Sequence, residues 1–288
     1  MTSLEDTLDD LYKKTGLAPY VATSRRNLDA LDLSIFNGRD VVKLLEDPEA
    51  RNFHEAYLVS NSLGFGNPEL KMKNWVYIDC VLMQSAVIGF CLPVKDVPSG
   101  VLSLYERDPY VEIETLDYIP ISGQVAGLSI NGQDLIGYSL FSLRRQLDGF
   151  DIPKLGVLTK YAALKAYKAD QKGRFVGLSQ YDNPALKTHA LFGREMRIDD
   201  VTVPLHPLRD MSFTYSMKVN FDEDRIFSGL DPEPAEEPDY LLRADDLDMK
   251  MIMQESAHTG TKFYILDPVH IKEKDGLYLP IKEESEAT

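Results

Sequence analysis

The residues best placed to do chemistry lie within 135–193, where a strand, a helix start and a polar turn follow one another. An apolar run over 135–143 predicts a strand, and helical periodicity over 153–169 predicts a helix with Gly156 in its first turn. The first N–H groups of a helix have no partner within it, and together with the helix dipole they attract anions. Cations stand nearby in the sequence at Arg144, Arg145, Lys154 and Lys160. The sequence therefore predicts an anion site around Gly156.

A second polar turn follows a strand predicted over 175–180, and it opens a short helix predicted over 183–192. Asp182 or Asn183 can accept hydrogen bonds from the first backbone N–H groups of that helix, so the turn is interpreted first as a helix cap, and ligand contact is compatible with that role. His189 lies among apolar residues of the helix, a pattern typical of a packed histidine. A catalytic role for His189 stays open.

This layout resembles the acyl-CoA N-acyltransferases of the GNAT superfamily. In that family, a strand–helix pair with a glycine-containing turn binds the coenzyme A pyrophosphate, and the next strand leads to an Asn and a helix of the form N..A…Y..LG. Here Asn183 and Gly193 begin and end the second motif, and His189 stands where the family usually has Tyr. The run Leu-Gly-Val-Leu-Thr at 155–159 stands at the pyrophosphate loop, although Leu158 replaces a small residue there. The loop before Gly156 is also longer than usual, and the resemblance covers about a fifth of the chain.

The resemblance implies transfer of an acyl group from an acyl-CoA-type thioester to an amine of a small molecule or peptide. The neutral amine attacks the thioester without an acyl-enzyme, so a base takes the amine proton and an acid protonates the leaving thiolate. By position, His189 or Tyr181 is the acid. The residues that would contact the cofactor are Tyr138, Ser139, Leu140, Phe141, Ser142, Leu143, Lys154, Gly156, Val157 and Asn183.

Asp79 is the candidate base, and it stands in an apolar run over 75–82 that predicts a buried strand. A carboxylate there needs a partner or faces solvent at the sheet surface, so an outward-facing strand residue explains Asp79 equally well. Cys80 and Cys91 lie in apolar segments and are interpreted as buried hydrophobic residues. No His, Cys or carboxylate spacing typical of a metal site is present in the sequence, so we expect no metal.

Composition narrows the class of protein. The 288 residues are 44% apolar and 27% charged, which is typical of a globular chain. The net charge of −15 argues against a nucleic-acid partner and fits a cationic amine substrate or a basic partner. No apolar run reaches the roughly 20 residues of a membrane span, and the N-terminus lacks the pattern of a secretory signal. We therefore expect a cytoplasmic protein without a membrane partner, and whether it forms a homo-oligomer stays open.

The pattern of the whole chain predicts an α/β (α+β) fold with a mixed central sheet flanked by helices. Helices are expected over 1–15 and over 37–63, the second split at Pro48, and further strands over 86–93, 111–121, 201–205 and 211–219. The expected organisation is a helical N-terminal part at 1–68, a mixed-sheet acyltransferase-like core at 69–229, an acidic Pro-rich linker at 230–240 and a C-terminal extension at 241–288.

Two further expectations concern the end of the chain and the function. In the C-terminal extension we expect a helix over 241–256 and two short strands within 261–279.

The alternative to an enzyme is a non-enzymatic assembly or binding protein with a degenerate acyltransferase-like core. The degraded pyrophosphate loop and the lack of a strong catalytic signature favour that alternative.

Overall fold

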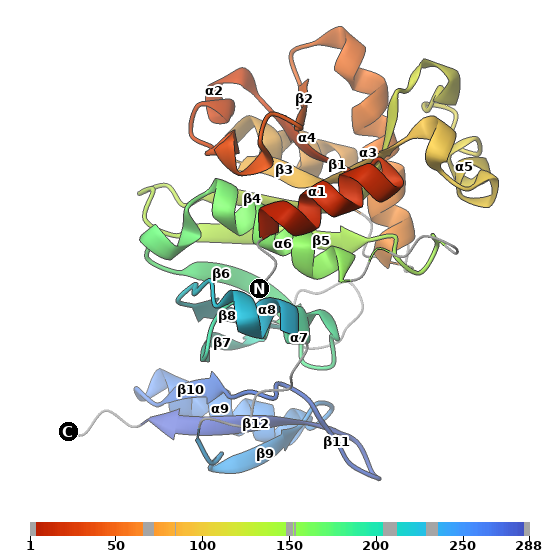
Figure 1. Cartoon of the computed structure of the whole chain (residues 1–288). Helices are drawn as coiled ribbons and strands as arrows, with labels where there is room; N and C mark the ends of the chain where they lie inside the picture. The colour runs from red at the N-terminus through yellow and green to blue at the C-terminus, as the bar shows by residue number, and fades with distance from the viewer. Residues whose placement is uncertain are drawn as a thin grey trace. The chain divides into compact units, whose positions relative to one another are not determined.

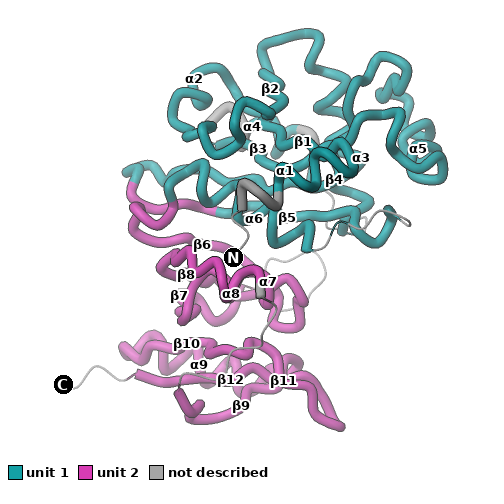
Figure 2. Tube along the Cα trace, in the orientation of Figure 1, with its two compact units in different colours: residues 1–132, 137–168 teal, residues 133–136, 169–288 magenta. Residues whose placement is uncertain are grey.

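The structure is a computed structural model, and it describes residues 4–65, 72–83, 85–147, 152, 154–203, 212–228 and 236–284. The chain forms two compact units, shown in Figure 2: the first contains 1–132 and 137–168, and the second contains 133–136 and 169–288. Both units combine strands with helices. The chain is therefore a mixed α/β protein with strands of mixed orientation flanked by helices, as the sequence predicts.

The first unit is built on strands in the order β2-β1-β3-β4, with β5 next to β4 (Figure 1). β1 runs parallel to β2 and antiparallel to β3, and β3 runs antiparallel to β4. The strands are β1 (Ala18–Thr23), β2 (Val41–Leu44), β3 (Ser85–Pro93), β4 (Tyr118–Leu128) and β5 (Leu135–Ser142), whose first two residues belong to the second unit. The helices are α1 (Leu4–Thr15), α2 (Arg25–Leu28), α3 (Arg51–Phe65), α4 (Asn74–Met83), α5 (Ser99–Tyr105) and α6 (Leu155–Ala166).

Two neighbouring residues of β4 show that α3 and α6 cover opposite faces of this strand. The hydroxyl of Thr159 on α6 donates a hydrogen bond of 2.7 Å to the hydroxyl of Ser122. At Gly123, an added Cβ would lie 2.9 Å from the ring of Tyr57 on α3 and 2.7 Å from the hydroxyl of Tyr20. Because successive residues of a strand point to opposite faces, Ser122 faces α6 and Gly123 faces α3. Glycine is required at position 123 because the rings approach the backbone so closely.

The core under α3 is rich in tyrosine, and the hydroxyl groups of Tyr20, Tyr77 and Tyr105 find partners inside it. Tyr57 stacks on Tyr77 with ring centroids 4.8 Å apart. The hydroxyl of Tyr20 donates to the carbonyl oxygen of Ser122 over 2.9 Å. The hydroxyl of Ser60 lies 2.8 Å from that of Tyr105. These bonds offset the cost of removing polar atoms from water, so the rings can fill the interior.

His54 on α3 is a buried titratable group in this core. His54 is 7% exposed, and its Nδ1 atom lies 2.5 Å from the hydroxyl of Tyr77. Burial lowers the pKa of the His54 imidazole from 6.5 to about 4. The folded protein therefore holds this side chain neutral near neutral pH.

The second unit contains an antiparallel set of strands in the order β6-β8-β7-β10-β12-β11, and β9 also pairs with β12. The strands are β6 (Phe175–Gln180), β7 (Met196–Val203), β8 (Ser212–Met217), β9 (Tyr240–Arg243), β10 (Lys262–Ile265), β11 (Ile271–Lys272) and β12 (Leu277–Glu284). The helices are α7 (Ala185–Ala190), α8 (Glu223–Ser228) and α9 (Leu247–His258). Gln254 on α9 accepts the backbone N–H groups of Val201 and Thr202 at 3.1 Å each, where the pairing of β7 with β8 is irregular.

Several predicted elements are confirmed: the strands over 86–93, 135–143, 175–180 and 211–219, and the helices over 1–15, 153–169 and 183–192, each to within a few residues. The prediction of a strand over 75–82 is wrong, because this run forms α4. An apolar run of this length without clear periodicity fits a helix as well as a strand. The residues 229–235, which include most of the predicted linker, lie outside the described residues.

Three other predictions are wrong in part. Residues 41–44 form β2 instead of helix, because Val41 and Val42 pair with β1. In the predicted strand over 111–121, strand structure begins only at Tyr118. The predicted helix over 241–256 begins at Leu247, and the residues before it form β9. The N-terminal range 1–68 therefore also contains strands, since pairing with distant segments overrides local helical pattern there.

The buried His54 predicts a stability loss in mild acid. The unfolded chain binds a proton below about pH 6.5, whereas the folded chain resists it down to about pH 4, so stability falls as the pH drops through this interval. We expect His54→Asn, which keeps an acceptor near the Tyr77 hydroxyl, to lose about 1 kcal/mol less than the wild type between about pH 7.5 and pH 5.5. Urea unfolding at the two pH values measures this difference. An equal loss in both proteins would contradict it.

Candidate functional site

The start of α6 has no side-chain cap. The N-cap residue Lys154 adopts left-handed backbone angles, with φ +54 and ψ 34, and its side chain makes no capping hydrogen bond. The N–H group of Leu158 donates to the carbonyl oxygen of Lys154 over 3.0 Å, as in a regular helix. The backbone N–H groups of residues 155–157 precede this bond and have no acceptor within the helix. They are the hydrogen-bond donors that the sequence predicts for an anion.

Gly156 lies beside open space. Among the residues that the structure describes, an added Cβ at this residue would meet only the Cβ of Ser142 within 4 Å, at an ordinary contact distance of 3.8 Å. The side chain of Leu158, which departs from the family loop, is buried in the interior at 2% exposure. Val157 is also buried. The bulky residues of this turn thus pack inward, and within the described part of the chain no side chain covers the glycine side of the turn.

The residues of β5 in the first unit differ strongly in exposure. Tyr138 is 52% exposed, Leu140 is half-buried and Phe141 is buried. The ring of Phe141 packs edge-on against that of Tyr57, with centroids 5.5 Å apart. The exposed ring of Tyr138 is therefore the part of this strand that a ligand can reach most easily.

Polar groups at the end of β5 are held by neighbours. The hydroxyl of Ser139 accepts a hydrogen bond of 3.0 Å from the amide of Asn61, a buried residue of α3. The hydroxyl of Ser142 accepts the backbone N–H of Arg144 over 3.3 Å. The N–H group of Leu143 donates to the carbonyl oxygen of Ile121 over 2.8 Å, so this donor is already used within the fold.

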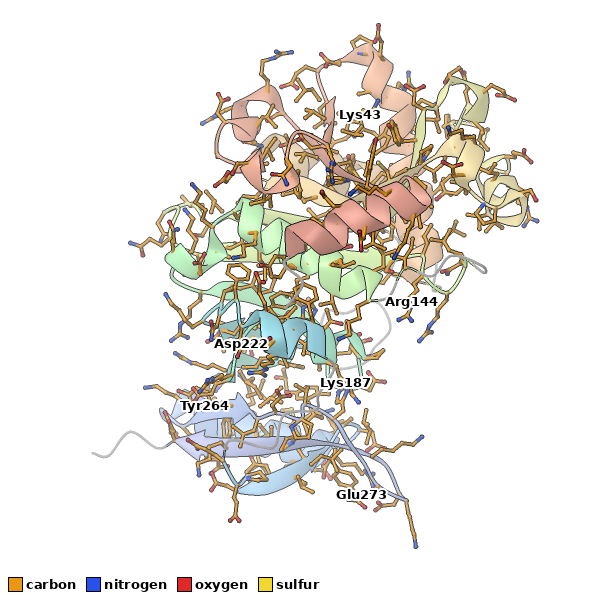
Figure 3. All side chains as sticks on the ribbon, in the orientation of Figure 1. Lys43, Arg144, Lys187, Asp222, Tyr264 and Glu273 are labelled. Atoms are coloured by element: carbon orange, nitrogen blue, oxygen red, sulfur yellow. The ribbon has the colours of Figure 1, made fainter. Side chains whose placement is uncertain are left out.

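The predicted cations around the helix start are only partly available. Arg144, labelled in Figure 3, and Arg145 are exposed, and Lys154 is half-buried. Lys160, by contrast, is fully buried, and burial lowers the pKa of its amine well below its ordinary value. The expectation that Lys160 supplies charge to an anion at Gly156 is therefore wrong. It fails because Lys160 lies one helical turn beyond Gly156, where the side chains of α6 are buried in the interior.

Tyr181 and His189, the predicted acids, belong to the second unit and are buried there. The hydroxyl of Tyr181 donates to the carbonyl oxygen of Val201 over 2.5 Å, and burial raises the pKa of this phenol. The Lys250 ammonium lies 4.2 Å from the centre of the Tyr181 ring. The imidazole of His189 packs beside Tyr215, with ring centroids 5.6 Å apart. In the second unit both side chains thus have packing roles.

Asn183 and Asp79 occupy simpler positions. The side-chain oxygen of Asn183 accepts the backbone N–H of Ala185 over 2.9 Å, which confirms the predicted capping role at α7. Asp79 is exposed on α4 and not on a strand. Its carboxylate therefore needs no buried partner. Cys91 is buried, and burial raises the pKa of its thiol, whereas the side chain of Cys80 lies outside the described residues.

Two cavities lie away from these residues. One, of about 630 Å³, is in the first unit, and its lining includes Lys43, Glu49, Asn52, Glu112 and Asp117. The other, of about 350 Å³, is in the second unit, and four cations line it: Arg174, Arg194, Arg197 and Lys218. Sequence analysis missed this cluster because its members are spread over more than forty positions, and only strand pairing brings them together. The excess of cations over 172–197 in an acidic chain is the one signal that points to it.

No protein-family model matches the chain, and no curated protein matches it at a significant level. Among the residues that the structure describes, no three histidine, cysteine or carboxylate side chains converge as metal ligands. Within the same residues, every helix is too short or too polar to cross a membrane.

The open space beside Gly156 predicts the effect of a methyl group there. Gly156→Ala adds a Cβ without a clash and removes backbone freedom from the unfolded chain, so we expect the free energy of unfolding to rise by about 0.5 kcal/mol. Gly123→Ala is the matched control: its Cβ would overlap the rings of Phe141 and Tyr57 and the hydroxyl of Tyr20, and we expect a loss of about 1–3 kcal/mol. Urea unfolding measures both. A clear loss of stability in Gly156→Ala would show that the turn is closed.

Proposed function

We propose that the protein is an acyl-CoA-dependent N-acyltransferase that binds the cofactor pyrophosphate at the start of α6. The observation that carries the proposal is the helix start without a side-chain cap, where no described side chain covers Gly156, on the helix that follows β5 in the chain. A diphosphate needs several convergent donors and a close backbone approach, and glycine permits that approach because it has no side chain. The amine of a small molecule or peptide is the proposed acyl acceptor.

Charge near the turn supports an anionic ligand. The N-terminus of α6 carries a partial positive charge from its aligned peptide dipoles. Arg144 and Arg145 are exposed on the segment that follows β5 and precedes α6. In a chain of net charge −15, the sequence between β5 and α6 carries Arg144, Arg145 and Lys154 against Asp148 and Asp151, an excess of one positive charge. The acidic remainder would favour an amine that arrives as a cation.

The order of elements also supports the proposal. Strand β5, helix α6, strand β6, the Asn183 cap and helix α7 follow one another as in the GNAT superfamily, to which the sequence is similar over 135–193. We therefore propose an acyl-CoA N-acyltransferase-like fold as the finer description of this mixed α/β protein. The exposed Tyr138 on β5 would lie along the pantetheine arm of the cofactor.

The chemistry needs a base for the amine and an acid for the thiolate. Tyr181 and His189 stay the proposed acids. In its present surroundings Tyr181 keeps its proton, because burial raises its pKa and the hydroxyl already donates to Val201. Asp79 is exposed on α4 and stays the proposed base. Binding and orientation of the thioester would supply the rest of the rate acceleration by placing it for direct attack.

Binding of acyl-CoA tests the proposal, and two variants at Gly156 isolate its electrostatic basis. Calorimetry with acetyl-CoA and longer acyl-CoAs measures the dissociation constants. Gly156→Gln and Gly156→Glu have side chains of nearly the same size, and a carboxylate in the first turn favours the helix itself. We expect Gly156→Gln to weaken binding about tenfold, and Gly156→Glu to weaken it by about a further tenfold through repulsion of the pyrophosphate.

The control is Glu106→Gln, an exposed residue at the C-terminal end of α5, whose loss of charge is expected to leave binding unchanged within about twofold. Equal binding by Gly156→Glu and Gly156→Gln would contradict the proposed anion site. Absence of binding to the wild type at millimolar acyl-CoA would refute the enzyme and favour the non-enzymatic assembly or binding protein.

A further inference from the structure

The cavity of the second unit has an unusual charge for this protein. Its volume is about 350 Å³, and its lining consists of Arg174, Arg194, Glu195, Arg197, Ser216, Met217, Lys218, Asn220 and Tyr264. Four of these nine residues are cations and one is an acid. The whole chain, by contrast, has 31 basic and 46 acidic residues. Convergence of cations against such a composition indicates a site for an anion.

Strand pairing explains why these residues meet. Tyr264 of β10 pairs with Arg197 of β7, and Arg197 pairs with Ser216 of β8, so the three side chains lie in one row on one face. Lys218 directly follows the last residue of β8 and lines the same pocket. Arg174 precedes β6, and its guanidinium donates to the hydroxyl of Ser216 over 2.9 Å. The pocket is thus built on paired strands, which hold its groups in a fixed arrangement. Figure 3 labels Tyr264 on β10.

The donors of the pocket are only partly used by the protein. One carboxylate oxygen of Asp199 lies 3.2 Å from Nε of Arg197 and 4.0 Å from Nη1 of Arg174. The ammonium of Lys218 donates to the carbonyl oxygen of Lys172 over 2.8 Å. Arg194 has no ion-pair partner among the residues that the structure describes. Each guanidinium carries five N–H donors, so most of them face the pocket or solvent.

The charge balance favours an anionic group. Glu195 lines the pocket, Asp199 pairs with two of its arginines, and Glu284 accepts the hydroxyl of the lining residue Tyr264 over 3.0 Å, so three carboxylates stand against four cations. The remaining positive excess favours an anion such as a phosphate monoester, which carries about −1.5 to −2 at neutral pH. Arginine forks fit phosphate oxygens with two parallel hydrogen bonds. A volume of about 350 Å³ suits a small molecule.

We propose that this pocket binds a small phosphorylated molecule through the phosphate monoester group, with Arg194, Arg197 and Lys218 as its principal contacts. The site lies wholly within the second unit, whereas Gly156 and the start of α6 lie in the first. It does not depend on the proposed acyl-CoA site, and it gives the protein a second anionic ligand.

Phenyl phosphate is the probe, and backbone amide chemical shifts of the full chain at constant ionic strength are the readout. We expect saturable shifts at Arg197 and at 216–218. Arg194→Gln and Arg197→Gln should each raise the dissociation constant about tenfold, because each removes a charge-assisted hydrogen bond. The control variant Lys274→Gln removes an exposed cation of the same unit that lies outside the pocket. It should change the dissociation constant for phenyl phosphate less than about twofold.

Arg194 is exposed and is not needed for a described ion pair, so its variant tests the site even if Arg197→Gln unfolds. Benzoate, with one negative charge on a similar ring, should bind at least about tenfold more weakly, and equal binding would refute the choice of phosphate. Absence of saturable shifts at 216–218 would overturn the proposal. Binding that survives Arg194→Gln but is lost in Gly156→Glu belongs to the helix start, and it would overturn this proposal while supporting the acyl-CoA site.

Discussion

Backbone N–H groups at the start of α6 are the constraint on which the proposed function depends. A helix leaves its first donors without internal acceptors, and each must find a side chain, water or a ligand. In this protein no side chain of the N-cap residue serves them, and no other described side chain covers the glycine at position 156. The same donors would be satisfied by a serine or aspartate cap in a helix with a purely structural role.

The rest of the first unit fixes this helix start in place. Thr159 ties α6 to Ser122 on one face of β4, and the tyrosine core under α3 packs against Gly123 on the other. Leu158 and Lys160 are buried, so the helix cannot roll without exposing apolar surface or moving a buried amine. A site held from both sides is preorganised, which lowers the cost of ordering it around a ligand.

Elements with their own periodicity could be predicted from the sequence, whereas elements defined by distant partners could not. The strand at 175–180 and the helix with Gly156 follow from local pattern and turn residues. The run at 75–82 has no clear period, and only packing makes it α4. β2 depends on pairing with β1. The pocket around Arg197 could not be predicted, because strand register and not spacing assembles it.

The most direct test of the central claim follows the amide resonances of Leu155, Gly156 and Val157 while coenzyme A is added to the isotope-labelled protein. If these N–H groups hold the pyrophosphate, their proton resonances move downfield together and saturate with one dissociation constant, as expected for charge-assisted hydrogen bonds. If coenzyme A leaves these three resonances in place, the start of α6 does not bind the cofactor, and the proposed acyltransferase activity loses its physical basis.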